Sequence, residues 1–170
     1  MKAIMSIVAA LALTPMAAYP HEDAHQGMMS GAAHGNAEGG HSAHGHAQGV
    51  GKPGDPKGVS RTIQVVMSDD MKFTPARIDV KRGETIRFVV RNAGRVKHEM
   101  VIGTMAELKQ HAELMRRMPG MEHADENQVT LAPGKAGELV WQFTKAGAVD
   151  FACLEPGHFE AGMTGSVRVK

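Results

Sequence analysis

The chain has 170 residues, enough for one modest domain with appendages and too few for a two-domain enzyme. Its 42% apolar and 22% charged residues are typical of a folded domain, and a formal net charge of +1 argues against a nucleic-acid-binding surface. A single cysteine excludes an internal disulfide, whereas ten histidines and thirteen methionines are an unusual supply of metal-binding side chains.

Residues 1–18 have the pattern of a secretory signal peptide. Lys2 provides a positive start, Ile4–Leu13 is a short apolar run, and Ala17-Ala18 offers small residues for cleavage. The apolar run is shorter than the roughly 20 residues needed to cross a bilayer. We therefore predict export to the periplasm without a membrane anchor.

Residues 19–58 form a segment rich in glycine and histidine that we predict to be disordered. Between His21 and Gly58 there is no Ile, Leu, Phe, Trp or Tyr, so the segment lacks the apolar surface needed to offset the entropy of ordering. Six of the ten histidines lie here: His21, His25, His34, His41, His44 and His46. Two interpretations stay open, a solubilising linker and a tail that collects further copper ions weakly, since imidazole is a good copper ligand.

Residues 59–170 carry the pattern of a β-rich domain. Seven stretches alternate or run apolar with β-branched residues, and turn signals such as Pro133-Gly134 separate them. They are Arg61–Ser68, Ala76–Lys81, Glu84–Asn92, Val96–Ile102, Gly137–Thr144, Gly147–Cys153 and Gly165–Lys170. About seven short strands in one domain indicate a β-sandwich.

One segment, at about 104–118, departs from this pattern and predicts a helical insertion. Thr104 and Glu107 have the spacing of a capping box, and apolar residues follow at helical intervals. The sequence Met118-Pro119-Gly120 ends the helix.

The last inter-strand loop holds a cysteine, a histidine and a methionine in the order C-x4-H-x4-M: Cys153, His158 and Met163. A fourth candidate, His98, lies on a strand well upstream. Two histidines and a cysteine with a weak axial methionine are the ligands of a mononuclear electron-transfer copper site. These four residues are therefore candidate ligands of one mononuclear copper site.

Other interpretations of the same residues have to be weighed. Each of them alone is more often a packing or hydrogen-bonding residue than a ligand, and a buried free cysteine is common. Cys153 and His158 could also form the nucleophile–base pair of a thiol hydrolase, but no orienting group is evident. The neighbours of the cysteine, Ala152 and Leu154, are not histidines that would lead to a second copper centre. We expect no enzyme activity and no catalytic residues.

Several motifs resemble those of the cupredoxins, in the same order along roughly residues 61–170. They are Phe73-Thr-Pro75, Ile78-Asp-Val80-x-x-Gly83, Phe88–Asn92, His98, Leu131-Ala-Pro-Gly134 and the C-x4-H-x4-M loop. The resemblance implies an all-β, Greek-key β-sandwich that binds one type 1 copper through His98, Cys153, His158 and Met163. The length of the loop is similar to that of the rusticyanin type.

A closer likeness is to the periplasmic copper-tolerance cupredoxins of the CopI group. The shared features are the His98-Glu-Met100 context, the methionine-rich insertion and the histidine-rich amino-terminal extension. Many cupredoxins have Asn after the first histidine ligand, where it braces the cysteine loop, so Glu99 is a departure. The resemblance implies a role in copper handling and tolerance, and the alternative is a dedicated electron carrier to a respiratory partner.

Two secondary features accompany the main site. Met115, Met118, Met121 and His123 are either a soft Cu(I) site or residues that pack the insertion onto the sandwich, and we favour packing. Pro156 and Phe159 flank His158 and, by the resemblance, would offer a docking surface to a redox partner.

Overall fold

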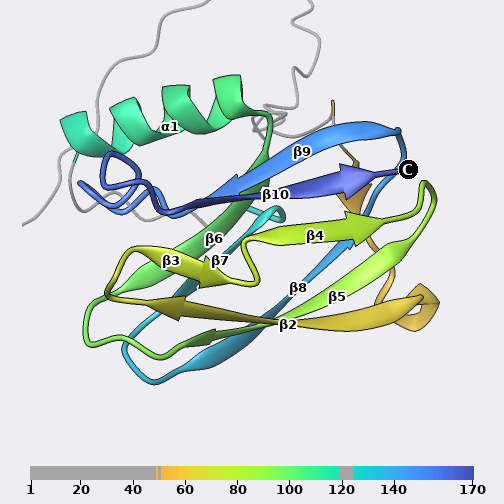
Figure 1. The fold of residues 1–170 in the computed structure, drawn as a ribbon, viewed down its shortest axis with the longest axis horizontal. Helices are drawn as coiled ribbons and strands as arrows, with labels where there is room; N and C mark the ends of the chain where they lie inside the picture. The colour runs from red at the N-terminus through yellow and green to blue at the C-terminus, as the bar shows by residue number, and fades with distance from the viewer. Residues whose placement is uncertain (1–48, 50, 119–124) are drawn as a thin grey trace, which may run out of the picture. The chain divides into compact units, whose positions relative to one another are not determined.

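The structure is a computed structural model that describes residue 49, residues 51–118 and residues 125–170. The expected signal peptide, the six tail histidines, Met121 and His123 lie outside these described residues. The described chain forms two five-stranded sheets and one α-helix (Figure 1).

Each sheet mixes antiparallel and parallel pairing. The order of the first sheet is β1 (Lys52–Pro53), β8 (Ala136–Gln142), β5 (Thr85–Asn92), β2 (Arg61–Ser68) and β3 (Lys72–Thr74). The order of the second is β4 (Arg77–Val80), β10 (Thr164–Val169), β9 (Gly147–Ala152), β6 (His98–Gly103) and β7 (Gln128–Leu131). The pairs β2–β5 and β4–β10 are parallel, and the other neighbours are antiparallel. This is the β-sandwich that the strand pattern predicts, with the Greek-key topology that the resemblance to the cupredoxins implies.

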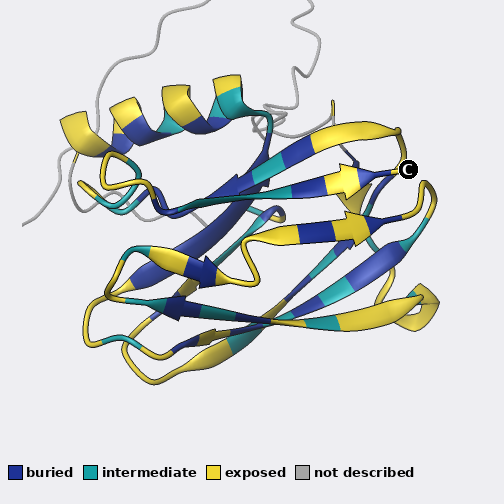
Figure 2. Cartoon of the chain, in the orientation of Figure 1, coloured by how far each residue is buried: buried dark blue, intermediate teal, exposed yellow. Residues whose placement is uncertain are grey.

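The core lies between the two sheets (Figure 2). Successive side chains of a strand point to opposite faces, so one set faces the other sheet and the next faces away from it. Phe88 of β5 and Phe143 meet edge to face, with their ring centroids 6.3 Å apart. Phe73 of β3 and Phe151 of β9 make the same kind of contact across the sandwich at 5.0 Å. Edge-to-face pairs of this kind add to the stabilisation from burial alone.

The helix α1 (Met105–Arg117) covers the outer face of the second sheet (Figure 1). Its N-terminus has the predicted capping box, in which the Thr104 hydroxyl accepts the N–H of Glu107 and the Glu107 carboxylate accepts the N–H of Thr104. The helix buries Leu108, Ala112 and Met115. All six residues of β6 are buried because the core covers one face of this strand and α1 covers the other.

The strand predictions hold for the seven long stretches, within two residues at each end. The short strands β1, β3 and β7 were not predicted, since runs of two to four residues give only a weak pattern, although β4, which also has four residues, was predicted. Lys52–Gly58, which the composition assigns to the tail, form β1 and a 3-10 turn at Pro56–Gly58, and β1 pairs with β8. Among the residues that the structure describes, no helix has both the length and the apolarity to span a membrane.

Candidate metal centre

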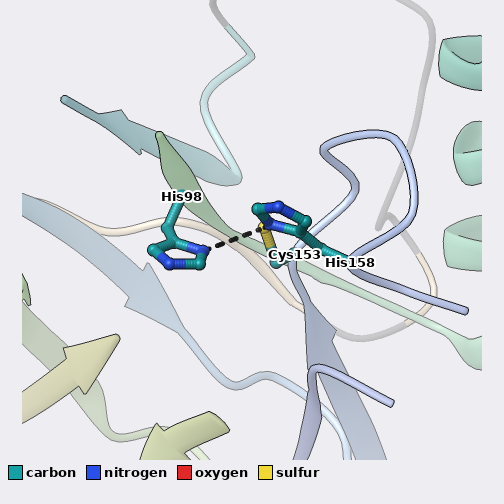
Figure 3. Close-up of side chains that lie close together, drawn as sticks. All are labelled: His98, Cys153 and His158. Atoms are coloured by element: carbon teal, nitrogen blue, oxygen red, sulfur yellow. Dashed lines mark hydrogen bonds between the residues drawn. The ribbon is translucent and has the colours of Figure 1, made fainter. Parts of the chain in front are cut away.

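The fold brings three of the four predicted ligands together at one end of the sandwich. His98 is the first residue of β6, Cys153 follows the last residue of β9, and His158 lies in the loop that leads to β10. Figure 3 shows the two imidazole rings meeting at the thiol of Cys153. Since β6 and β9 are neighbouring antiparallel strands, this convergence follows from the register of the sheet.

The geometry of this His–Cys–His cluster (His98, Cys153 and His158) is compact. The Sγ atom of Cys153 lies 3.2 Å from Nδ1 of His158 and 3.9 Å from Nδ1 of His98. The three donor atoms all lie within 4.8 Å of one another, and the imidazole centroids are 4.8 Å apart. Both rings therefore present the same nitrogen, Nδ1, toward one sulfur atom.

Met163 lies at the end of the same loop and is fully buried in the main core, as Cys153 is. The Cys153 N–H donates to the carbonyl of Met163 at 3.1 Å, and the Met163 N–H donates to the carbonyl of His158 at 3.0 Å. A turn within the loop is closed by the His158 N–H, which donates to the carbonyl of Glu155 at 2.9 Å. Backbone hydrogen bonds thus hold the three loop candidates in a fixed arrangement.

Burial sets the protonation of the cluster in the absence of metal. Burial raises the pKa of the Cys153 thiol to about 12, so the thiol is protonated at neutral pH. Burial, followed by the nearby His98, lowers the pKa of His158, so this imidazole is neutral and its lone pair is available. A metal ion that binds here displaces the thiol proton and meets the neutral imidazole of His158.

Glu99 ties β6 to the cysteine loop. Its backbone N–H lies 3.4 Å from Cys153 Sγ, and its carboxylate accepts the N–H of Leu154 at 2.9 Å and the hydroxyl of Thr130 at 3.1 Å. Only 5% of Glu99 is exposed, and its burial, with a contribution from Glu155, raises the pKa of the carboxyl group. The carboxyl group therefore sits inside the protein with hydrogen-bond partners on both oxygens.

Asp69 is a further contact residue of the cluster that sequence reasoning missed. Its Oδ1 atom lies 3.1 Å from Nε2 of His98, and its Oδ2 atom accepts the N–H of Arg95 at 2.8 Å. The hydrogen bond from Arg95, followed by the one from His98, holds the pKa of Asp69 below its usual range. Asp69 stands in an ordinary turn sequence after β2, so no local signal marks it.

The residues around Cys153 pack against the helical insertion. Leu108, Ala112 and Met115 of α1 contact Val101, Ala152 and Leu154, and Phe159 packs against this group. The burial of Met115 agrees with a packing role, whereas Met118 is 39% exposed. The insertion therefore covers the backbone on both sides of the cysteine.

Comparisons with known proteins also indicate a copper-binding protein. The copper-binding plastocyanin/azurin family matches residues 61–170. The chain is 58% identical over 137 residues to the copper-resistant cuproprotein CopI of Rubrivivax gelatinosus, covering 81% of this chain and 83% of that protein. It is 38% identical to the copper-resistant cuproprotein CopI of Pseudomonas aeruginosa, covering 74% of this chain and 84% of that protein.

The chain belongs to the plastocyanin/azurin family of copper-binding proteins. Solved cupredoxins support the fold. Auracyanin B aligns with a TM-score of 0.60 at 17% identity, covering 71% of this chain and 96% of its own. An auracyanin from Roseiflexus castenholzii aligns with a TM-score of 0.56 at 22% identity, covering 66% of this chain and 99% of its own.

The donor set of this cupredoxin fits the copper that its family binds. Two imidazoles and a thiol suit copper better than magnesium or calcium, which prefer oxygen ligands. The buried position of the thiol keeps water away from the sulfur. Glu99, which replaces the asparagine that many cupredoxins have, makes hydrogen bonds of its own to the cysteine loop.

Proposed function

We propose that this chain is a periplasmic copper-tolerance protein that binds one type 1 copper ion through His98, Cys153, His158 and Met163. The observation that carries the proposal is the convergence of Nδ1 of His98, Nδ1 of His158 and Sγ of Cys153 within 4.8 Å. The likeness to two cuproproteins named as copper-resistant favours tolerance as the role of that copper. The sequence of residues 1–18 supports export.

Bound copper would supply one-electron exchange between Cu(I) and Cu(II). The residues of the chain hold the donors still during that exchange: His98 is held by β6, and backbone hydrogen bonds close the loop from Cys153 to Met163. A site that does not rearrange accepts both oxidation states at a low energetic cost. The hydrogen bond from the Glu99 N–H to the sulfur stabilises negative charge on the sulfur.

The six histidines of the tail would bind additional copper weakly. Their support is compositional, because a glycine-rich segment with many imidazoles binds copper without needing a fold. We assign Met115 to packing because it is buried on the side of α1 that faces the second sheet.

A dedicated electron carrier is the alternative function. The observation in its favour is that His158 is the half-exposed member of the cluster, beside the exposed Pro156 and Gly157. A redox partner would approach there and next to Phe159, which is half-buried against the helix cluster.

A thiol hydrolase is the least favoured alternative. The short distance from Cys153 to His158 would suit a nucleophile–base pair. However, the sulfur is fully buried and its pKa is raised to about 12, so it is neither accessible to a substrate nor ionised at neutral pH.

The test of copper binding is a titration of the purified full chain with Cu(II). We expect an intense visible charge-transfer band with wild-type protein and no such band with Cys153→Ala. A colourless wild-type protein with an intact thiol would contradict the type 1 assignment. Deletion of residues 21–46 should lower the number of copper ions bound and leave the band unchanged.

The test of the role is deletion of the gene in the native host. Copper sensitivity that wild-type protein reverses, and Cys153→Ala does not reverse, supports tolerance. Loss of a respiratory activity with unchanged copper sensitivity would support the electron carrier instead.

A further inference from the structure

A carboxylate contacts the imidazole of His98 on the side that faces away from Cys153. Nε2 of His98 lies 3.1 Å from Oδ1 of Asp69, while Nδ1 faces Cys153. Aspartate is ionised at neutral pH and an ionised carboxylate can only accept hydrogen bonds, so Nε2 is the nitrogen that carries the proton. In a neutral imidazole the proton on Nε2 leaves a lone pair on Nδ1, the atom that points at the cluster.

The position of Asp69 is built by the loop between β5 and β6. The Arg95 N–H donates to Oδ2 of Asp69 at 2.8 Å, so both carboxylate oxygens have a donor. The loop is held in turn by Asn92, which accepts the Gly94 N–H at 2.8 Å and donates to the carbonyls of Val96 and Leu131 at 2.8 and 2.9 Å. These bonds tie the loop to the strand that pairs with β6.

Glycine at position 94 is what lets the carboxylate approach. A Cβ atom on Gly94 would lie 1.9 Å from Oδ1 of Asp69 and 3.1 Å from Nε2 of His98. Any larger residue would therefore displace Asp69. The contact requires Asp69, Gly94 and Asn92 together, which sets it apart from an ordinary surface ion pair.

We propose that Asp69 is a positioning residue for His98, whose carboxylate fixes the Nε2–H tautomer and places negative charge beside the copper ligand. This inference rests on the copper site proposed above. A negative charge hydrogen-bonded to the ligand stabilises the more highly charged Cu(II) relative to Cu(I). Asp69 thereby lowers the reduction potential of the bound copper without touching it.

The first test uses the metal-free wild-type protein. Long-range 15N–1H NMR correlations of His98 report which imidazole nitrogen carries the proton. We expect the Nε2–H tautomer at neutral pH, and the Nδ1–H tautomer would overturn the proposal. This measurement needs neither copper nor a variant, so its outcome is separate from that of copper binding.

The second test compares Asp69→Asn with Asp70→Asn, which removes the same charge from the neighbouring residue. Asp70 contacts Ser68 and Lys72 and makes no hydrogen bond to the cluster. We expect Asp69→Asn to lower the ratio of Cu(II) to Cu(I) affinity about tenfold, with little change in Asp70→Asn and recovery in Asp69→Glu. Equal ratios in the two Asn variants would overturn the proposal, whereas a wild-type protein without a visible copper band would contradict the proposed function itself.

Discussion

The Oε1 atom of Glu99 accepts the backbone N–H of Leu154 at 2.9 Å, and this bond joins two sequence-distant parts of the cluster. Glu99 follows His98 on β6, and Leu154 follows Cys153 at the end of β9. The bond therefore controls the distance between the strand that carries one candidate ligand and the loop that carries three.

Removal of the Glu99 carboxyl group should destabilise the metal-free protein. In Glu99→Ala the buried N–H of Leu154 loses its acceptor, which costs about 1–3 kcal/mol. Glu99→Gln keeps an acceptor oxygen and is the matched control, with a smaller loss expected. Urea unfolding of the metal-free variants measures the difference, and equal stability of Glu99→Ala and wild type would contradict a bracing role.

Much of the fold and most of the candidate site could be predicted because their signals are local. The β2 bounds agree with the predicted Arg61–Ser68 because β-branched residues and polar residues alternate there until Asp69. The loop from Cys153 to Met163 carries its ligand types within eleven residues, so their spacing alone indicated copper. His98 was a less local prediction, because its distance to the loop depends on β6 pairing with β9. The sequence offered it as a fourth candidate, and the resemblance to the cupredoxins implied the same residue.

The parts that could not be predicted depend on contacts between distant segments. Asp69 reaches His98 across 29 positions, and nothing in its own turn distinguishes it from Asp70. The contact exists because Gly94 leaves room and Asn92 holds the loop, which are facts of three-dimensional packing. Likewise, Lys52–Pro53 become a strand only because the edge of β8 offers them partners.

The packing of the helical insertion can be tested on two leucines of α1. Leu108 is 2% exposed on the buried side of the helix, whereas Leu114 is 40% exposed on its outer side. Leu108→Ala should cost about 2–5 kcal/mol of unfolding free energy, because it leaves a cavity over the residues that flank Cys153. Leu114→Ala should change it by about 0.5 kcal/mol or less. Similar losses in both variants, measured by chemical unfolding, would show that α1 is not held by its buried face.

The axial role assigned to Met163 can be tested with a substitution that keeps the volume. Met163→Leu should raise the reduction potential, because loss of a weak fourth donor destabilises Cu(II) more than Cu(I), while the visible band persists. Stability should fall by less than about 1.5 kcal/mol. Met67→Leu, a substitution at another fully buried methionine of the same core, should leave the potential unchanged. A redox titration of the copper-loaded proteins measures the two potentials, and chemical unfolding measures the stability. Identical potentials in wild type and both variants would remove Met163 from the ligand set.

Acid should weaken the turn that precedes β5. The hydrogen bond from the Lys81 N–H at 2.7 Å, with a contribution from Arg61, lowers the pKa of Glu84 in the folded state. A lowered folded-state pKa means that the stabilisation is present above the pKa of the unfolded chain and is lost as the pH falls through the folded value. Glu84→Gln should therefore be less stable than wild type near pH 7, by about 1 kcal/mol or less, and this difference should shrink as the pH falls below the ordinary pKa of glutamate. Thermal unfolding across this pH range measures the difference, and a gap that widens on acidification would contradict the assignment.

Gly94→Ala should reproduce the effect of losing the Asp69 carboxylate without changing any charge. The added Cβ would lie 1.9 Å from Oδ1 of Asp69, so the carboxylate must leave Nε2 of His98. The ratio of Cu(II) to Cu(I) affinity, measured by competition with chelators, should fall about tenfold. The same substitution in the Asp69→Asn background should lower the ratio little further, because both substitutions disrupt the same interaction between Asp69 and His98. Gly58→Ala, where the nearest atom to an added Cβ is 3.9 Å away, is the control and should leave the ratio unchanged. A normal ratio in Gly94→Ala, or full additivity with Asp69→Asn, would mean that Asp69 does not act through its contact with His98.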